Sequence, residues 1–139
     1  MKEAIQSGFD RLLAGGALLL FTVGCIFVGY FNPSTAGFFP ACPLLTITGF
    51  ACPGCGLTRG FHAFFQGDVL TALSFNALIP IYLVGFLYLA GMLLSIVVRG
   101  KSLPYKIVAP SFFSFYLVVS ITFGVLRNIP AYPFTALFP

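Results

Sequence analysis

Three of the four cysteines lie in one short apolar stretch, which begins at Cys42 and reads CPLLTITGFACPGCGLTR. Within it, Cys52 and Cys55 enclose a Pro-Gly pair, and Arg59 closes the stretch. The sole histidine of the chain, His62, follows shortly after. Thiols and an imidazole at these spacings are the groups that form disulfides, redox pairs or metal sites. The stretch is therefore the candidate site, and three chemistries fit it.

The first chemistry is a structural disulfide. Cys42 can pair with Cys52 or with Cys55, and either bridge would stabilise the protein by about 2–3 kcal/mol through the loop that it closes. One of the three cysteines then stays unpaired. Cys25 is a poor partner because it lies in the middle of an apolar segment, where a cysteine most simply acts as a small apolar side chain.

The second chemistry is redox exchange, with Cys52 and Cys55 as the reactive pair and Cys42 as a shuttle. A Cys-Pro-Gly-Cys turn that runs into a helix places Cys55 near the helix N-terminus, where backbone N–H groups and the helix dipole lower a thiol pKa. Against this chemistry, the chain has no room for a thioredoxin domain, and a Cys-x-x-Cys pair by itself is a weak signal.

The third chemistry is a metal site. Cys42, Cys52, Cys55 and His62 supply a Cys₃His set that tetrahedral zinc accepts, although the sequence contains one Cys-x-x-Cys pair only. No cofactor is predicted, and zinc is the alternative. A c-type haem is excluded because Gly56, and not a histidine, follows the cysteine pair.

The composition predicts that this site belongs to a membrane protein. Of the 139 residues, 59% are hydrophobic and only 7% are charged, and the mean hydropathy is +1.03. A soluble domain carries roughly 25% charged residues, so this chain lacks the polar surface that water requires. The net charge of +4 reflects scarce acidic residues and not a basic tract, so no nucleic-acid partner is predicted.

The sequence predicts an all-α membrane protein, a single membrane domain over residues 1–139. Pro80 and Pro110 fall in the first turns of two of its apolar segments, where a missing N–H does no harm. The first segment is not expected to be a cleaved signal peptide, because it exceeds a usual h-region and no Ala-x-Ala-type site follows it. Three segments are long enough to form transmembrane helices, roughly residues 12–31, 79–98 and 107–127.

Basic residues predict the orientation through the positive-inside rule. They precede the first segment and fill the connection between the second and the third: Lys2, Arg11, Arg99, Lys101 and Lys106. The N-terminus and the 99–106 connection are therefore expected in the cytoplasm. The cysteine-containing outer segment, residues 32–75, is expected outside, in an oxidising compartment where disulfides persist.

The outer segment is too apolar for a solvated loop, so we expect short interfacial helices that lie against the membrane. Leu44–Thr48 favours an extended conformation. Leu57–Gln66 favours a short helix that carries Arg59 and His62 on one stripe together with its last residue.

Several residues in the outer segment and just after it also have a simple structural role. Gly67 suits the end of the helix just described, and Asp68 suits the N-cap of another over residues 69–75. Asn76 is expected to cap the membrane helix that follows. Arg59 is expected to anchor loop carbonyls or to pair with Asp68, and His62 to be an interfacial polar residue.

The motif CPGCGLTR resembles a bacterial family of small membrane proteins, domain of unknown function 2752. A cysteine ten positions earlier, a later Gly-Asp pair and an Asn before a membrane helix add to the resemblance. Ala77 departs from the family, whose members often carry Pro after the Asn. The resemblance implies a membrane architecture and no accepted activity. The matching positions are Cys42, Cys52, Pro53, Gly54, Cys55, Gly56, Thr58, Arg59, Gly67, Asp68 and Asn76, and Arg127 and Asn128 resemble the family's closing pattern.

The predicted topology brings Arg127 and Asn128 to the same side of the membrane as the cysteines. Arg127 would most simply snorkel at the end of the third helix. With Arg59, His62 and Asp68, it would also form one polar cluster that docks an outer-side protein or a small anionic group.

Two function classes remain open beside a zinc site. In the first, the protein is a non-enzymatic accessory or interaction subunit with a cysteine-braced outer segment. The lack of a soluble domain, a cofactor motif and a general base favours this class. In the second, it is a membrane thiol–disulfide oxidoreductase or redox sensor that uses Cys52 and Cys55. The expected location is the bacterial plasma (inner) membrane as a multi-pass protein, and the expected partners are the lipid bilayer, other membrane subunits or an outer-side protein.

Overall fold

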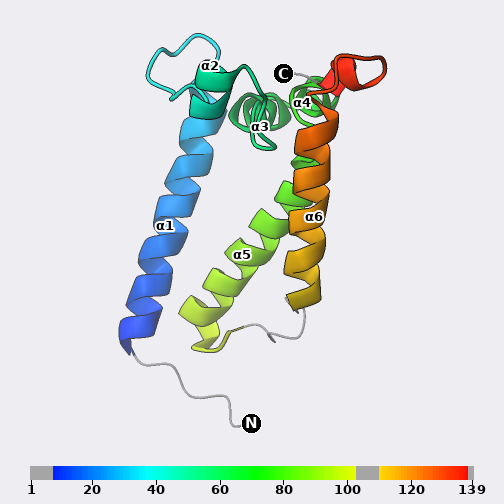
Figure 1. Ribbon diagram of the computed structural model, residues 1–139. Coiled ribbons are helices and arrows are strands. Elements are labelled where there is room, and N and C mark those ends of the chain that lie inside the picture. Colours follow the sequence, from blue (N-terminus) through cyan, green and yellow to red (C-terminus); the bar gives the residue numbers. More distant parts are fainter. Residues whose placement is uncertain (1–7, 103–109, 138–139) are drawn as a thin grey trace.

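The computed structural model describes residues 8–102 and 110–137, and these residues form helices and turns without a strand. Three longer helices run along the molecule (Figure 1): α1 (Gly8–Tyr30), α5 (Ile79–Arg99) and α6 (Pro110–Leu126). Four short elements lie together at one end of them, which we call the cap end: α2 (Pro43–Thr48), α3 (Leu57–Phe65), α4 (Val69–Phe75) and the 3-10 helix η2 (Phe134–Leu137).

Two of the predicted spans form helices that are long and apolar enough to cross a membrane, α1 and α5. The third predicted span, 107–127, begins outside the described residues. From Pro110 it forms a helix of 17 residues, which is shorter than the roughly 20 residues that cross a bilayer. Pro110 is the first residue of α6, and Pro80 lies in the first turn of α5, as predicted.

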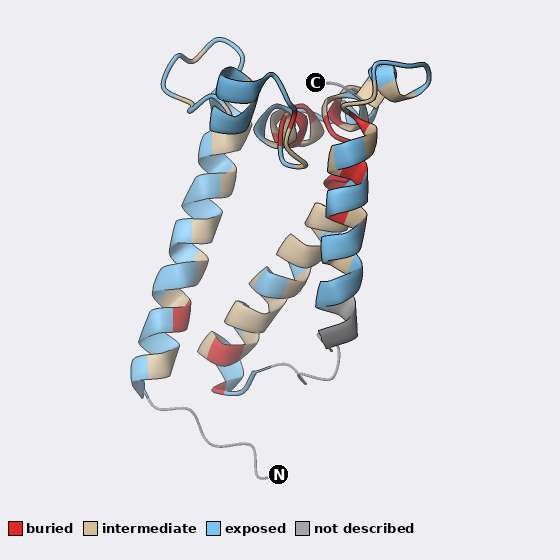
Figure 2. Ribbon diagram, in the orientation of Figure 1, coloured by how far each residue is buried: buried red, intermediate tan, exposed pale blue. Residues whose placement is uncertain are grey.

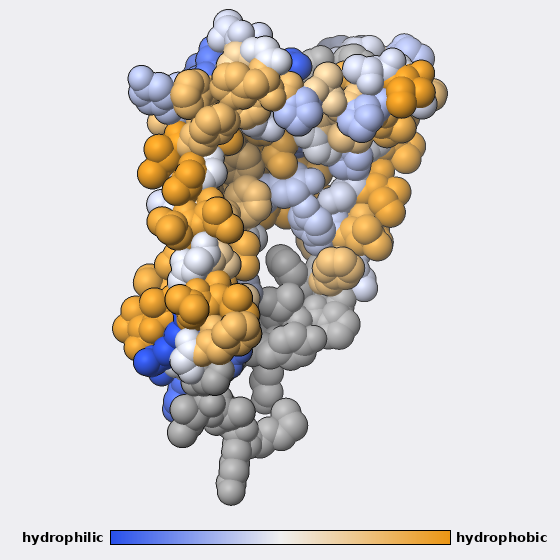
Figure 3. Space-filling model, turned by 90° about the vertical axis from the view of Figure 1, so that its left-hand side faces the viewer, coloured by the Kyte–Doolittle hydropathy of each residue, from blue (hydrophilic) through white to orange (hydrophobic). Residues whose placement is uncertain are grey.

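The long helices bury little of their apolar surface within the protein (Figure 2). Leu12 and Leu20 of α1 are 73% and 74% exposed, and Leu87 of α5 is 65% exposed. Figure 3 shows hydrophobic side chains over much of the face that α1 forms. A helix of a water-soluble protein buries its apolar stripe against a core. These faces therefore need an apolar covering from outside the chain, which a bilayer provides.

The packed core lies at the cap end, where α3, α4 and the start of α5 meet. Phe61 and Ala63 of α3 are buried against Ala72 of α4 and Ile79 of α5. Gly60 permits this close approach. A Cβ at that position would collide with the Ile79 side chain and lie 3.0 Å from the carbonyl oxygen of Ala72.

Two polar side chains of the predicted α3 stripe attach this helix to the end of α1. The Nδ1 atom of His62 donates to the carbonyl of Val28 at 2.8 Å, and the Nε2 atom of Gln66 donates to the carbonyl of Gly29 at 2.8 Å. Both carbonyls belong to the last turn of α1, where no intrahelical donor is available. The stripe therefore serves to fix the position of α3.

The predicted short helices at 57–66 and 69–75 are confirmed as α3 and α4. Gly67 adopts a left-handed φ of 85° between them, and its N–H donates to the carbonyl of Phe64 at 3.0 Å. The N-cap of α4 is Asp68, whose Oδ1 accepts the N–H of Thr71 at 3.0 Å. Local capping chemistry thus sets both helix boundaries.

The prediction of an extended conformation for Leu44–Thr48 is wrong, because this stretch lies in helix α2. Pro43 begins the helix with a pre-set φ, and Gly49 ends it with a left-handed φ of 76°. The hydroxyl of Thr48 donates to the carbonyl of Leu44 at 2.6 Å. The two boundary residues outweigh the weak strand preference of the threonines and isoleucine between them.

We predict that the Asp68 cap stabilises the protein only while its carboxylate is ionised. The hydrogen bonds from Thr71 lower the pKa of Asp68. Because the folded-state pKa lies below the unfolded value of about 3.9, the stabilisation is present above that value and is lost as the pH falls through the folded pKa. Thermal unfolding in detergent should show that Asp68→Ala lowers the melting temperature at neutral pH, with the difference from the parent shrinking in acid.

Asp68→Asn is the matched control, because an asparagine amide oxygen accepts the same N–H without a titrating group. Its melting temperature should stay close to that of the parent at neutral pH. A difference between Asp68→Ala and the parent that does not change with pH would contradict the prediction.

Candidate functional site

The sulfur atoms of Cys42, Cys52 and Cys55 converge at the cap end. The Sγ atoms of Cys42 and Cys52 are 3.4 Å apart, those of Cys52 and Cys55 are 3.2 Å apart, and all three lie within 4.8 Å of one another. A disulfide joins its sulfurs at about 2.05 Å, and all three cysteines are free. The structure therefore contains a cluster of three thiols, the thiol cluster, in place of the predicted disulfide.

Two backbone turns bring the three thiols together. Cys42 immediately precedes Pro43, the first residue of α2. The turn from Cys52 to Cys55 is closed by the N–H of Cys55, which donates to the carbonyl of Cys52 at 3.0 Å. Gly56 then adopts a left-handed φ of 80°, which only glycine adopts without strain, and α3 begins at the next residue. The thiol cluster thus joins the start of α2 to the start of α3.

The pKa values of the Cys42 and Cys55 thiols are shifted in opposite directions. Burial raises the pKa of Cys55 to about 12, and the neighbouring Cys42 and Cys52 thiols add to this effect. The backbone N–H of Leu45, followed by the Cys55 thiol, lowers the pKa of Cys42 to about 7. The prediction that the helix start lowers the pKa of Cys55 is therefore wrong, because desolvation outweighs the helix terminus. The more acidic thiol is Cys42.

Arg127 and Asn128, at the end of α6, hold the cysteine turn by its backbone. The Nη1 atom of Arg127 donates to the carbonyls of Cys52 and Cys55 at 3.0 and 3.1 Å. The amide of Asn128 pairs with both backbone groups of Ala51: its Oδ1 accepts the N–H at 2.7 Å, and its Nδ2 donates to the carbonyl at 2.8 Å. Side chains far away in the sequence thus satisfy the polar backbone of the turn.

Asn76, between α4 and α5, holds the same turn from the other side. Its Nδ2 donates to the carbonyls of Pro53 and Cys55 at 2.8 and 3.1 Å, and its Oδ1 accepts the N–H of Leu78 at 2.9 Å. The side chain is only 1% exposed. Asn76 ends α4, and Leu78 is the N-cap of α5. The predicted capping role therefore accounts for only part of what Asn76 does.

The other predicted site residues of the outer segment contact other groups than the three thiols. Arg59 is exposed, with its guanidinium carbon 6.0 Å from the ring centroid of Phe75. His62 binds the end of α1 and is not among the residues whose ligand atoms gather with the three sulfurs. Asp68 caps α4. Within the described residues, the potential ligand set is therefore Cys₃ and not Cys₃His.

Sequence reasoning missed Gly124, which brings α6 against the cysteine turn. A Cβ at this position would lie 2.8 Å from Cγ and 3.1 Å from Cδ of Pro53. The only sequence signal is its place in the same helical turn as Arg127 and Asn128. A glycine at that spacing from two residues of interest indicates that the helix is packed closely there.

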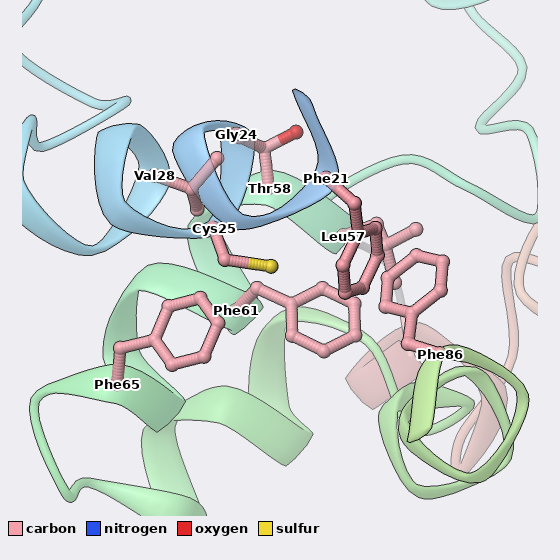
Figure 4. Close-up of a pocket in the computed structure, with 9 residues that line it drawn as sticks. All are labelled: Phe21, Gly24, Cys25, Val28, Leu57, Thr58, Phe61, Phe65 and Phe86. Carbon is pink, nitrogen blue, oxygen red and sulfur yellow. The ribbon is translucent and has the colours of Figure 1, made fainter. Parts of the chain in front are cut away.

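A separate apolar cavity of about 320 Å³ lies between α1, α3 and α5 (Figure 4). The sulfur of Cys25 points into it, toward the ring of Phe61 (Figure 4). The lining contains no charged residue. This environment agrees with the prediction that Cys25 acts as a small apolar side chain.

One family model matches residues 42–90, and that family is described as a protein of unknown function (DUF2752). The resemblance predicted from the cysteine motif is therefore confirmed for this part of the chain. The matched segment contains the thiol cluster and Asn76, and it extends into α5. No curated protein and no solved structure matched the chain.

We predict that Gly124→Ala destabilises the protein, although alanine is normally the better helix former by about 0.5–1 kcal/mol. The added methyl group meets the rigid Pro53 ring and pushes α6 away from the turn, and such overpacking costs about 1–3 kcal/mol. Gly85→Ala is the matched control, because no atom lies within 4 Å of a Cβ there. Thermal unfolding in detergent should show a lower melting temperature for Gly124→Ala alone, and equal effects would contradict the prediction.

Proposed function

We propose that this chain is a plasma-membrane protein that binds a zinc ion through the thiolates of Cys42, Cys52 and Cys55. The observation that carries the proposal is the convergence of the three Sγ atoms within 4.8 Å of one another. Cysteine thiolates are among the preferred ligands of zinc. A metal ion, and not a disulfide, would then hold the outer segment together. The protein would still be an accessory subunit.

The distances in the thiol cluster fit a zinc ion. Zinc lies about 2.3 Å from a thiolate sulfur, so tetrahedral geometry separates two sulfurs by about 3.8 Å. Two pairs in the cluster are 3.2 and 3.4 Å apart and the third pair lies within 4.8 Å, so the three sulfurs are close enough for one ion to reach all of them after a small adjustment. The N–H of Cys52 also donates to the Sγ of Cys55 at 3.2 Å, which offsets part of the rise that burial causes in the pKa of this thiol.

Three protein ligands leave one position of a tetrahedral ion open. Structural zinc sites are normally closed by four protein ligands, whereas an open position takes water or a further ligand. The centre would therefore brace α2 against the start of α3 and also present a position where a partner group binds. This second property suits a protein that docks another subunit or an outer-side protein.

The proposed setting is a bilayer crossed by α1, α5 and α6, with the cap end outside. In support, α1 and α5 are of spanning length, and both expose large apolar side chains. The three longer helices extend between the same two ends of the molecule (Figure 1). The basic residues Arg11 and Arg99 lie at the end away from the cysteines, which the positive-inside rule assigns to the cytoplasm.

A second candidate function is thiol–disulfide exchange, which the lowered pKa of Cys42 favours. The Cys42 thiolate would attack a substrate disulfide and release one substrate thiolate. The Sγ of Cys52, 3.4 Å away, would then give up its proton and attack the mixed disulfide. A Cys42–Cys52 disulfide forms, the second substrate thiolate leaves, and the substrate gains the two electrons that the protein loses.

We predict that protein purified without oxygen in detergent retains about one zinc ion per chain. Each of Cys42→Ser, Cys52→Ser and Cys55→Ser should lose most of this metal, because serine does not replace a thiolate ligand. Elemental analysis of the purified proteins measures the zinc content.

Cys25→Ser is the matched control and should keep its zinc, because Cys25 lies in the apolar cavity and not in the thiol cluster. Alkylation followed by mass spectrometry separates the two candidate functions. A metal-free protein with a reducible Cys42–Cys52 disulfide would contradict the metal proposal and support exchange.

For the topology, we predict that a membrane-impermeant maleimide labels Cys42 from outside intact cells. The chain used for this measurement carries Cys25→Ser, Cys52→Ser and Cys55→Ser, so that a single thiol remains. The matched control adds Lys101→Cys to a chain without native cysteines, and it should be labelled only after the membrane is opened. Labelling of position 101 in intact cells would contradict the proposed orientation.

A further inference from the structure

Arg127 is a buried positive charge without a matching acidic side chain among the described residues. It is 1% exposed, and its Nη2 atom has no hydrogen-bond partner. Its remaining nitrogens donate to backbone carbonyls of the described residues, those of Cys52, Cys55 and Leu137. A guanidinium is always charged in proteins, and a buried charge is strongly destabilising unless an opposite charge lies nearby.

The acidic residues that the structure describes lie away from Arg127. The whole chain has three: Glu3, Asp10 and Asp68. Glu3 lies outside the described residues, and Asp10 is in the first turn of α1, at the end of the molecule opposite the cap end. Asp68 caps α4 through Thr71. None of the described carboxylates therefore contacts Arg127.

Within the part of the chain that the structure describes, the thiol cluster is the remaining source of negative charge beside Arg127. Two of the three carbonyls that accept its hydrogen bonds belong to Cys52 and Cys55, so the guanidinium lies directly behind the turn that carries these thiols. The ring of Phe123 covers another side, with its centroid 4.9 Å from the guanidinium carbon. An apolar surface of this kind weakens the screening of any charge on the sulfurs.

We infer that Arg127 is the counter-charge of a metal–thiolate centre, an inference that rests on the zinc binding proposed above. A divalent ion and three thiolates carry a net charge of −1, and the guanidinium carries +1. The occupied centre and Arg127 together are therefore neutral, which is the condition for burial at the cap end. Arg127 is a positioning and affinity-determining residue, and it is not a ligand.

A counter-charge differs from a side chain that only donates hydrogen bonds to the turn, and two substitutions distinguish these two roles. Arg127→Gln keeps an N–H₂ group that donates to the turn carbonyls and removes the charge. Arg127→Lys keeps the charge and loses the planar group that binds two carbonyls at once. If the charge matters, Arg127→Lys should bind Zn²⁺ more tightly than Arg127→Gln. If only the hydrogen bonds matter, the order should be reversed.

The experiment is a competition titration of the full-length metal-free protein in detergent with Zn²⁺, and in parallel with Co²⁺ as a spectroscopic probe. Arg127→Gln should bind Zn²⁺ about 10–100-fold more weakly, the usual effect of removing a residue that supports metal ligands. Arg127→Lys should keep most of the affinity and the thiolate-to-cobalt absorption of the parent. Arg59→Gln is the matched control, because it removes the same charge from an exposed residue of the cap end.

Two results would overturn the inference: parental Zn²⁺ affinity in Arg127→Gln, or equal losses in Arg127→Lys and Arg127→Gln. If a variant unfolds without metal, refolding on addition of Zn²⁺ replaces the titration, and recovery of Arg127→Lys but not of Arg127→Gln is expected. If the parent binds no metal, the proposed function and this inference fall together. If the parent binds zinc and Arg127→Gln does so equally well, this inference falls alone.

Discussion

The rest of the structure depends on the hydrogen bonds by which the side chains of Arg127 and Asn128 bind the backbone of the cysteine turn. The carbonyls of Pro53 and Cys55 in this turn receive their hydrogen bonds from Asn76 and Arg127, and without these side chains they would face apolar surroundings. Such a group costs about 1–3 kcal/mol when it is left unsatisfied. The side chains that supply the donors come from the start of α5 and the end of α6. The conformation of the turn therefore depends on side chains that these helices position.

These hydrogen bonds also explain why most buried residues lie at one end of the molecule. α1 and α5 expose apolar side chains along their length and bury few of them. Packing between long helices therefore contributes little that a bilayer would not also provide. At the cap end, by contrast, buried side chains, hydrogen bonds and the close approach of Gly124 to Pro53 coincide. The close packing and the hydrogen bonds that define the fold therefore lie in the same region that positions the thiols.

Sequence reasoning predicted the features of this protein that local chemistry sets. The spans at α1 and α5 follow from long apolar runs, and the boundaries around Gly67 and Asp68 follow from capping rules. The third span is different, because part of its predicted range lies outside the described residues and α6 is short. Length and hydropathy identify a helix well, but they do not by themselves establish that it crosses a bilayer.

What sequence reasoning missed depends on burial or on contacts between distant segments. The helix dipole suggested an acidic Cys55, yet burial raises its pKa to about 12, and Cys42 is the more acidic thiol. His62 completes a zinc ligand set by composition, yet it binds the end of α1 instead. Neither outcome follows from spacing along the chain, since spacing records neither desolvation nor the direction of a side chain.

The odd number of thiols bears on what the cluster does. A disulfide uses two sulfurs and leaves the third as a free thiol, which an oxidising compartment attacks. A metal ion uses all three sulfurs, and coordination keeps them reduced. Cys52 lies close to both other thiols, because its Sγ is 3.4 Å from that of Cys42 and 3.2 Å from that of Cys55. A centre that engages the three sulfurs together, with a buried cation behind it, accounts for features that a single disulfide would leave unexplained.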